Sequence, residues 1–353
     1  MQIEVRRTNA PRPRPESELG FGRIFADHMV RMDYAPERGW HSPRVEPYAP
    51  IQLDPTAAVL HYAQAIFEGL KAFRGKDGQV RMFRPDRHAA RFAKSAERVC
   101  IPPVPEDVFV ETCRKLVEVD RDWVPTADGA ALYIRPLAFA TEPFLGVRPS
   151  LSYTYLVMTS PVGAYYAEGF APVRIVVERR EVRAAHGGLG SCKTPANYAA
   201  SLHAAQAAKK KGFSQVLWTD AAEHRYVEEV GTMNLFVHLG DEIVTPALDG
   251  AILAGVTRDS VIQLLKAKGL PVVERRLALD EIRAAHDKGQ LHEIFGTGTA
   301  AVVSPVSALG VDDEVWTIGK GDVGPLARSL FDQIVAIQRG QAEDRFGWMF
   351  PVG

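Results

Sequence analysis

The chain has 353 residues, 46% of them hydrophobic and 24% charged, which describes an ordinary globular protein long enough for two domains. Lys and Arg number 42 against 43 Asp and Glu, so the net charge of −1 argues against non-specific nucleic-acid binding. The three cysteines form no CxxC pair, which indicates neither a disulfide framework nor a zinc site. No stretch approaches the roughly 18 apolar residues of a membrane span. We therefore expect a cytoplasmic protein without a metal site.

The first thirty residues are interpreted as a flexible N-terminal segment. They are rich in arginine and proline, and the apolar core that a signal peptide contains does not follow them. Glu4, Glu16 and Glu18 interrupt the positive charge, which weakens an interpretation as a transit peptide.

Helical and strand patterns alternate in the first domain, which we expect over residues 31–165. Strands are expected at 79–83, 131–134 and 151–160, and helices at 87–99 and 106–119. Proline and glycine follow at 161–163, and a loop runs through Gly169. These residues predict an interdomain linker at 166–175.

The second domain, expected over residues 176–353, is richer in strands. Short apolar runs separated by turn residues predict strands at 173–177, 215–219, 225–228, 234–239 and 242–245. Helical patterns interrupt the series at 195–211, 257–268, 279–288 and 323–338. The first of these helices is well delimited, because Pro195 suits a first helical turn and Gly212 ends the pattern.

Two residues, Lys193 and Glu229, suggest a cofactor site. Lys193 ends a Gly-rich turn directly before the helix that begins at Pro195, so a short turn holds it in place. Glu229 follows a predicted strand and precedes Gly231, where the backbone could approach a flat ring. A pyridoxal phosphate enzyme needs an amine and a carboxylate at the two ends of its cofactor. The amine holds the aldehyde carbon as a Schiff base, and the carboxylate keeps the ring nitrogen protonated.

Each of these residues also has an ordinary interpretation. Most lysines are solvated surface charges, and a glutamate in a turn is commonly solvated as well. A phosphate loop of a nucleotide hydrolase is a further alternative for the lysine turn, because Thr194 follows Lys193. That motif needs glycine directly before the lysine, however, and Cys192 stands there.

Two Gly/Thr segments are candidates for a phosphate site. The segment Gly255-Val256-Thr257 opens a predicted helix, whose first N–H groups and positive dipole end suit an anion. Residues 296–300 form a second loop of this character, although short Gly-rich runs are usually only turns. Tyr198 offers a phenol for the 3′-oxygen of the cofactor, with helix packing as the alternative.

These blocks resemble the fold-type IV pyridoxal phosphate enzymes. The resemblance rests on the lysine turn and on residues 229–236, 253–258 and 295–300. Further blocks resemble branched-chain-amino-acid aminotransferases, and the match covers essentially the whole chain: Tyr62, residues 67–73 (FEGLKAF), residues 133–136 (YIRP) and residues 348–351 (WMFP). D-amino-acid aminotransferases and aminodeoxychorismate lyases share the cofactor blocks but lack this N-terminal set.

The resemblance implies an α+β fold of two domains in a homodimer. A small α/β sandwich domain would precede a larger pseudo-barrel domain, with pyridoxal 5′-phosphate in the cleft between them. The implied reaction is a reversible ping-pong transamination of L-leucine, L-isoleucine and L-valine with 2-oxoglutarate, in which Lys193 moves the α-proton. The expected partners are small-molecule substrates, with neither nucleic acid nor a membrane.

The resemblance also assigns roles to individual residues. Lys193 is the catalytic residue, Glu229 binds the pyridine nitrogen, Tyr198 meets the 3′-oxygen and Leu253 packs on the ring. The implied phosphate and further cofactor contacts are Arg91, Gly255, Val256, Thr257, Thr299 and Thr232. The implied substrate contacts are Tyr62, Phe67, Tyr133, Arg135, Thr232, Thr299 and Ala300, with Val147 reaching in from the partner subunit. An apolar pocket of this kind suits the branched side chains, and Arg135 with the tyrosines would admit glutamate.

One departure and two rival functions complete the sequence interpretation. Animal members of the family carry a CxxC redox pair where this chain has Ala301 and Ser304, so thiol control of that kind should be absent. A lyase or a D-specific transaminase would keep the cofactor, but residues 133–135 count against it. A non-catalytic binding protein would be expected to lack Lys193 or Glu229, and both are present.

Overall fold

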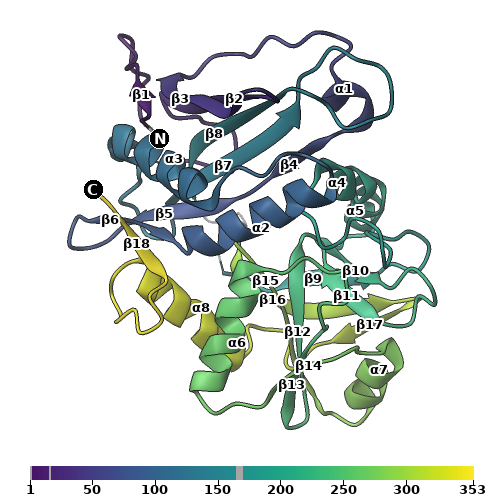
Figure 1. Cartoon of the computed structure of the whole chain (residues 1–353). Helices are drawn as coiled ribbons and strands as arrows, with labels where there is room; N and C mark the ends of the chain where they lie inside the picture. The colour runs from purple at the N-terminus through teal and green to yellow at the C-terminus, as the bar shows by residue number, and fades with distance from the viewer. Residues whose placement is uncertain (1, 16, 164–169) are drawn as a thin grey trace. The chain divides into compact units, whose positions relative to one another are not determined.

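The computed structural model describes residues 2–15, 17–163 and 170–353, and they divide into two compact units (Figure 1). Unit 1 holds the described residues up to 163, the segment Cys192–Pro195 and the C-terminal residues Ala336–Gly353. Unit 2 holds residues 170–191 and Ala196–Val335. The chain thus enters and leaves unit 1 more than once. Residues 166–169 of the predicted linker at 166–175 lie outside the described residues.

Unit 1 is built on a mixed sheet with the strand order β1-β3-β2-β8-β7-β5-β6-β18, and β4 pairs with β7. Its strands are β1 (Glu4–Val5), β2 (His28–Ala35), β3 (Gly39–Pro47), β4 (Ala65–Phe67), β5 (Leu70–Arg74), β6 (Val80–Phe83), β7 (Ala131–Ala140), β8 (Tyr153–Val162) and β18 (Met349–Val352). The central strands β2, β8 and β7 pair antiparallel, and Val30 lies opposite Val157. The predicted strand at 131–134 is longer in the structure, because pairing with β8 continues to Ala140.

Two helices, α2 (Pro85–Arg98) and α3 (Glu106–Val119), lie across one face of this sheet, where both were expected (Figure 1). Apolar residues at helical spacing face the sheet from each helix, and Phe92 and Phe109 are at most 1% exposed. Their rings lie 5.2 Å apart, and both contact the ring of Tyr155 on β8. This aromatic cluster is part of the core of unit 1. The short helices α1 (Ala58–Tyr62) and η1 (Arg121–Trp123) complete the unit.

The N-terminal segment was expected to be flexible over residues 1–30, and several of its described residues make hydrogen bonds to the rest of unit 1. β1 pairs with β3 in parallel, and the backbone N–H of Thr8 donates to His28 Nε2 at 2.9 Å. The N–H of Arg12 donates to Asp27 Oδ1 at 2.8 Å. The segment is therefore held by long-range hydrogen bonds, which its composition does not reveal.

In unit 2, six of the described strands form a closed ring. The pairings run β11-β10-β9-β16-β15-β12, and β12 pairs back to β11. β13 and β14 extend the sheet from β12, and β17 pairs with β16. The bounds are β9 (Val173–Val177), β10 (Gln215–Thr219), β11 (Val227–Val230), β12 (Met233–Leu239), β13 (Glu242–Thr245), β14 (Val272–Glu274), β15 (Leu291–Gly298), β16 (Val302–Val311) and β17 (Glu314–Thr317). The closed ring and the mixed sheet of unit 1 confirm the predicted fold class, an α+β fold with a pseudo-barrel.

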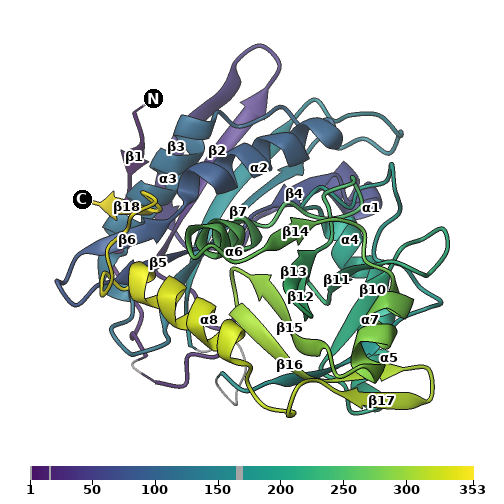
Figure 2. The same cartoon turned by 90° about the horizontal axis from the view of Figure 1, so that it is seen from below.

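Helices surround the ring of unit 2, and Figure 2 shows α8 alongside β15 and β16. The helices are α4 (Pro195–Ala200), α5 (Leu202–Lys210), α6 (Val256–Ala267), α7 (Leu279–Asp287) and α8 (Pro325–Gln338). Glu293 on β15 fixes the start of α8, because its carboxylate accepts hydrogen bonds from the backbone N–H groups of Leu326 and Ala327 at 2.8 and 2.9 Å. None of the helices in the described part of the chain has the length and apolar character that a membrane span requires.

Two predicted elements of unit 2 differ from the structure. The helix expected at 195–211 is divided at Ser201, whose hydroxyl bonds back to the carbonyl of Tyr198 at 2.8 Å. The strand expected at 225–228 begins at Val227 instead. Asp220 is the reason, because its carboxylate accepts backbone N–H groups as far as Tyr226 and holds a turn there. The shift places Glu229 inside β11 rather than after it.

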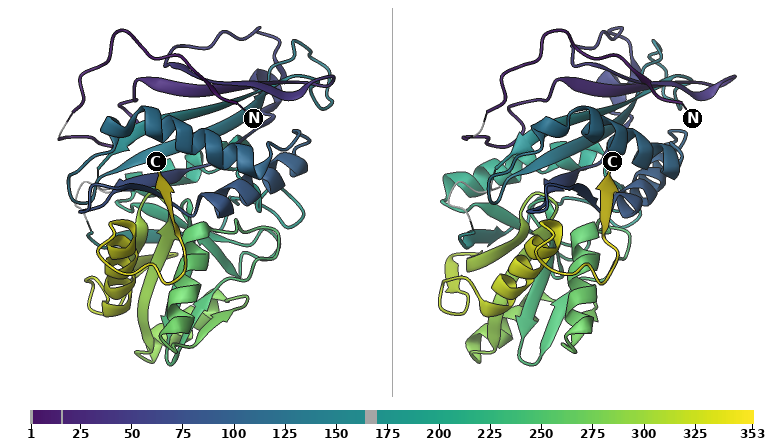
Figure 3. Two further views of the ribbon diagram at one scale, coloured as in Figure 1. Left: turned by 60° about the vertical axis from the view of Figure 1, so that its left-hand side comes forward. Right: turned by 90° about the vertical axis from the view of Figure 1, so that its left-hand side faces the viewer.

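The C-terminal residues differ from the expected domain division. Residues 176–353 were expected in one domain, but Ala336–Gly353 belong to unit 1. The cause is β18, which pairs antiparallel with β6 and sets Phe350 opposite Met82; it is the yellow strand near the C-terminus in Figure 3. Pairing between strands so far apart in sequence follows from tertiary packing and has no local signal.

Candidate functional site

Lys193 lies in unit 1, where two neighbouring elements fix its backbone. Its N–H donates to Ser95 Oγ on α2 at 3.0 Å, and its carbonyl accepts the N–H of Phe67 on β4 at 3.0 Å. The hydroxyl of the next residue, Thr194, donates to the carbonyl of Ala65 at 2.9 Å. Lys193 Nζ lies 4.8 Å from the centroid of the Phe67 ring, within the range of a cation–π contact. The lysine is therefore positioned by long-range bonds as well as by its turn.

Phe67, Tyr133 and Arg135 come together in the same unit. Tyr133 and Arg135 are two positions apart on β7 and so point to the same face of the sheet. The Arg135 guanidinium lies 4.8 Å from the Phe67 ring and 5.3 Å from the Tyr133 ring, and its Nη2 donates to the Tyr133 hydroxyl at 3.0 Å. Arg135 Nε is buried without a hydrogen-bond partner among the described residues. A guanidinium held over two rings with a donor to spare suits a carboxylate ligand.

Two other predicted substrate residues, Tyr62 and Val147, lie on the surface of unit 1. Tyr62 ends α1, is 45% exposed and donates its hydroxyl to the carbonyl of Leu145. Val147, in the loop between β7 and β8, is 85% exposed. The structure holds one chain, so the predicted role of Val147 in a partner subunit stays a prediction.

Arg91 belongs to a buried ion-pair cluster between α2 and the end of β4. Its Nε and Nη2 donate to the two carboxylate oxygens of Glu68 at 2.6 and 2.9 Å, and His88 Nδ1 lies 2.8 Å from Glu68 Oε2. Glu68 is fully buried. Burial acts to raise its pKa, but the Arg91 charge and the His88 contact lower it well below its usual range. Burial lowers the pKa of His88. The cluster therefore holds an ionised Glu68 between Arg91 and His88.

Glu229 lies in unit 2 and is 3% exposed. Arg183 Nε is 2.5 Å from its Oε2, and Asn234 Nδ2 donates to its Oε1 at 2.9 Å. Asn234 stands directly opposite Glu229 in the β11–β12 hairpin. Arg183 is itself held by the carbonyls of Gly190 and Ala251. One carboxylate oxygen thus accepts a hydrogen bond from Asn234 and the other is ion-paired with Arg183, which restricts the orientation of Glu229.

The N-terminus of α6 lies next to this carboxylate. Gly255 is the N-cap residue in extended conformation, and Val256 and Thr257 begin the helix, each 6% exposed. Asn234 joins the two features, because its Nδ2 also donates to the carbonyl of Leu253 at 2.8 Å, and a Cβ at position 255 would overlap its Oδ1. A glycine at the N-cap leaves a helix start that a small anion can approach closely.

The remaining predicted residues of unit 2 lie in short connections. Thr299 and Ala300 are half-buried in the turn between β15 and β16, next to Thr297, whose buried hydroxyl has no hydrogen-bond partner in the described chain. Thr232 is exposed in the β11–β12 turn. Tyr198 is half-buried on α4.

Sequence reasoning missed several residues that hold the predicted ones in place. Asn234 had a usable signal, because it mirrors Glu229 across a short turn between two expected strands. Arg183, Ser95 and Glu68 had none. Their contacts join segments far apart in the chain, such as the 98 residues that separate Ser95 from Lys193.

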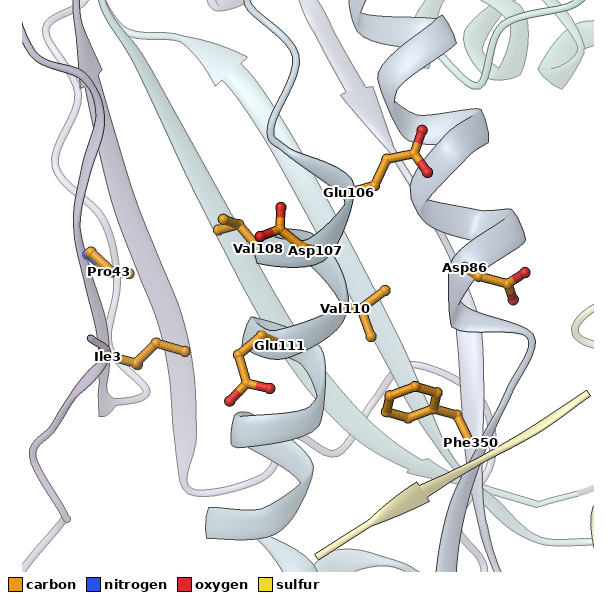
Figure 4. A pocket seen from close by; sticks show the side chains of 9 residues that line it. All are labelled: Ile3, Pro43, Asp86, Glu106, Asp107, Val108, Val110, Glu111 and Phe350. Carbon is orange, nitrogen blue, oxygen red and sulfur yellow. The ribbon is translucent and has the colours of Figure 1, made fainter. Parts of the chain in front are cut away.

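Two hollows lie away from these residues. The first, of about 510 Å³ in unit 1, has carboxylates of α2 and α3 around an apolar floor that includes Val108 and Phe350 (Figure 4). The second, of about 780 Å³ in unit 2, is lined by His238, His286 and His292 among others. The described residues contain no group of three or more His, Cys, Asp or Glu side chains arranged to hold a metal ion.

Comparison with known proteins places this arrangement in context. The model of the family described as amino-transferase class IV matches residues 65–309. Branched-chain-amino-acid aminotransferase 2 of Bacillus subtilis (strain 168) is 52% identical over 348 residues, which cover 99% of this chain and 96% of that protein. Two solved structures of the T.th. branched-chain amino acid aminotransferase are similar, each covering 94% of this chain and 100% of theirs. One holds pyridoxamine 5′-phosphate (28% identity, TM-score 0.78) and the other N-(5′-phosphopyridoxyl)-L-glutamate (28%, 0.75).

Proposed function

Because this chain belongs to the class IV aminotransferase family, we propose that it is a branched-chain-amino-acid transaminase. It transfers the amino group of L-leucine, L-isoleucine or L-valine to 2-oxoglutarate and gives the branched 2-oxo acid and L-glutamate. The same reaction runs in reverse.

The side chains present fit pyridoxal 5′-phosphate. The observation that carries this assignment is Glu229, a buried carboxylate fixed by Arg183 and Asn234 beside a helix start capped by glycine. A carboxylate so placed can accept the N–H of a pyridine ring, and the helix start can receive a phosphate group. When bound, pyridoxal phosphate supplies an aldehyde carbon that carries the amino group and a ring that withdraws electrons.

Lys193 is the proposed catalytic residue. Its Nζ would hold the cofactor through the aldehyde carbon when no amino acid is bound, and the freed amine would remove the α-proton of the substrate and deliver it to the carbon that carried the aldehyde. The bonds from Ser95 and Phe67 to its backbone restrict this movement to the side-chain torsions. Because only the side chain of Lys193 moves, little of the surrounding protein has to rearrange during the reaction.

The proposed cofactor contacts divide into those of the ring and those of the phosphate group. Glu229 accepts the ring N–H, Tyr198 donates to the 3′-oxygen, and Leu253 packs against the ring. The phosphate is held by Arg91 and by residues at the two Gly/Thr segments: Gly255, Val256, Thr257 and Thr299, with Thr232 nearby. The support for this set is the helix start at Gly255 and the buried guanidinium of Arg91.

The proposed substrate wall combines aromatic rings with one cation. Phe67 and Tyr133 offer an apolar surface to a branched side chain, and Arg135 Nε supplies a donor for the second carboxylate of glutamate. The set is completed by Tyr62, Thr232, Thr299 and Ala300. Val147 would reach the site of a second copy in a homodimer, which the 85% exposure of this apolar residue supports.

A cytoplasmic location is part of the same proposal, and the three free cysteines support it.

A substrate panel tests the assignment. The purified protein with added pyridoxal phosphate is given L- and D-forms of leucine, isoleucine, valine and alanine, with 2-oxoglutarate as acceptor, and glutamate is measured. We expect rapid formation of L-glutamate from the three branched L-amino acids only. Turnover of D-alanine would favour a D-specific transaminase, and no glutamate from any of the amino acids would favour a lyase.

A further inference from the structure

In the cluster of Glu68, His88 and Arg91, one edge of the Arg91 guanidinium is held in a fixed orientation. The Glu68 carboxylate accepts two hydrogen bonds from Arg91, one from Nε and one from Nη2. Its Oε2 also accepts the backbone N–H of Gly69 at 3.0 Å, and His88 Nδ1 lies 2.8 Å away. With these donors around it, the Glu68 carboxylate has no freedom to rotate. Arg91 is thereby held in one plane and one direction.

This orientation decides how Arg91 can meet a ligand. A guanidinium has five N–H donors, and the paired edge is committed to Glu68. The edge formed by Nε and Nη2 therefore faces Glu68 and is not the edge that an anion meets. Arg91 is 9% exposed and Glu68 is fully buried, so the carboxylate lies behind the guanidinium rather than in the path of a ligand.

Arg91 also shares a helix with the residue that fixes the catalytic lysine. His88, Arg91 and Ser95 follow one another at helical spacing on α2 and so face the same side. Ser95 accepts the N–H of Lys193 from this face. The helix α2 thus carries Arg91 on one turn and, on the next, the residue that holds the backbone of Lys193.

We propose that Glu68 is a positioning residue that presents Arg91 to the phosphate group of the cofactor. The inference rests on the proposed function, since it takes Arg91 as a phosphate ligand. Glu68 itself touches neither cofactor nor substrate. Its effect is on the direction of the guanidinium, because two hydrogen bonds from Nε and Nη2 to one carboxylate fix the guanidinium plane.

Two substitutions distinguish an effect of Glu68 on the direction of the Arg91 guanidinium from an effect of its negative charge. Glu68→Gln keeps the shape but turns an amide donor toward Arg91 or His88, which breaks the paired bonds and leaves a buried cation uncompensated. Glu68→Asp keeps the charge but is one methylene shorter, so it cannot reach both Nε and Nη2. If direction matters, both variants lose phosphate recognition. If charge alone matters, Glu68→Asp behaves as wild type, and Glu68→Gln binds the phosphate dianion more tightly.

Binding of pyridoxal phosphate is compared with binding of pyridoxal, which lacks the phosphate group. The dissociation constant of each is measured by fluorescence titration of the full-length protein freed of cofactor. Glu111→Gln serves as the matched control, because Glu111 makes the same two-bond pair with Arg114, at 2.7 Å each, on the surface of the same unit. Melting temperatures of all variants report folding.

We expect both Glu68 variants to weaken pyridoxal phosphate binding by about tenfold or more, with pyridoxal binding changed less than twofold and Glu111→Gln unchanged. In an Arg91→Met background, Glu68→Asp should have no further effect on pyridoxal phosphate. Equal losses for both ligands, or unchanged phosphate selectivity, would overturn the role of Glu68 while leaving the enzyme assignment intact. If Glu68→Gln does not fold, Glu68→Asp and its pairing with Arg91→Met decide the question. Wild-type protein that binds neither compound would overturn the proposed function, and the role of Glu68 with it.

Discussion

Glu228 is a buried carboxyl group that should make the stability of this protein depend on pH. It precedes Glu229 on β11, is 5% exposed, and its Oε2 has no hydrogen-bond partner among the described residues. Burial raises the pKa of Glu228 from 4.5 to about 7, and the carboxylates of Asp249, Glu229 and Asp220 add to the rise while Arg183 opposes it. Glu228 is therefore largely protonated below neutral pH in the folded protein.

The sign follows from proton binding to the two states. The pKa of Glu228 is higher in the folded protein than in the unfolded chain, so protonation stabilises the fold. This contribution is complete below about pH 4.5 and is lost as the pH rises through about 7. A change from 4.5 to about 7 corresponds to roughly 3 kcal/mol for a fully desolvated group. For a group that is not fully desolvated the value is smaller, and we expect about 1–2 kcal/mol.

Glu228→Gln removes the titration while keeping the shape of the protonated side chain. Melting temperatures of the wild type and the variant are measured at pH 5 and pH 8 under identical ionic strength. Between pH 5 and pH 8 the melting temperature of the variant should rise relative to that of the wild type by about 1–3 °C. Glu223→Gln is the control, because Glu223 lies in the same unit with a half-exposed side chain. Parallel behaviour of wild type and Glu228→Gln across this range would refute the reasoning.

Two further changes test the fold and the substrate wall. Gly190→Ala should destabilise the protein by roughly 1–3 kcal/mol, seen as a lower melting temperature, because the added Cβ would overlap the backbone carbonyl of Ala251; an unchanged melting temperature would contradict the described packing. Arg135→Met should raise KM for 2-oxoglutarate by about tenfold or more and change KM for the branched 2-oxo acids far less. Equal changes for both acceptor classes would show that Arg135 does not select the second carboxylate.

The residues proposed to carry chemistry could be predicted from the sequence where they lie in a local pattern. Lys193 stands before a helix with proline in its first turn, and Glu229 precedes a glycine turn. Gly255 opens an amphipathic helix, so its place at the N-cap of α6 was foreseeable from capping preferences. These residues lie at a turn or at a helix end, so the local pattern that forms the element also determines where they lie.

The supporting residues could not be predicted, because their partners are distant in the chain. Glu68 meets Arg91 across 23 residues, and the side chain of Arg339 reaches the carbonyl of Ala130 across 209. A charged residue in an apolar strand pattern could equally be a solvated edge residue. Only the packing of α2 against the sheet of unit 1 makes Glu68 fully buried and so requires a partner for it.

The identity of the lysine that binds the cofactor tests the central claim most directly. Lys71 is the rival in unit 1, because it is buried and burial, together with the charge of Arg339, lowers its pKa to about 8. Reduction with borohydride in the presence of pyridoxal phosphate attaches the cofactor permanently to the lysine that holds it, and peptide mass spectrometry then locates it. We predict a single modified peptide with the pyridoxyl group on Lys193. Modification of Lys71 in its place, or no modification at all, would contradict the account.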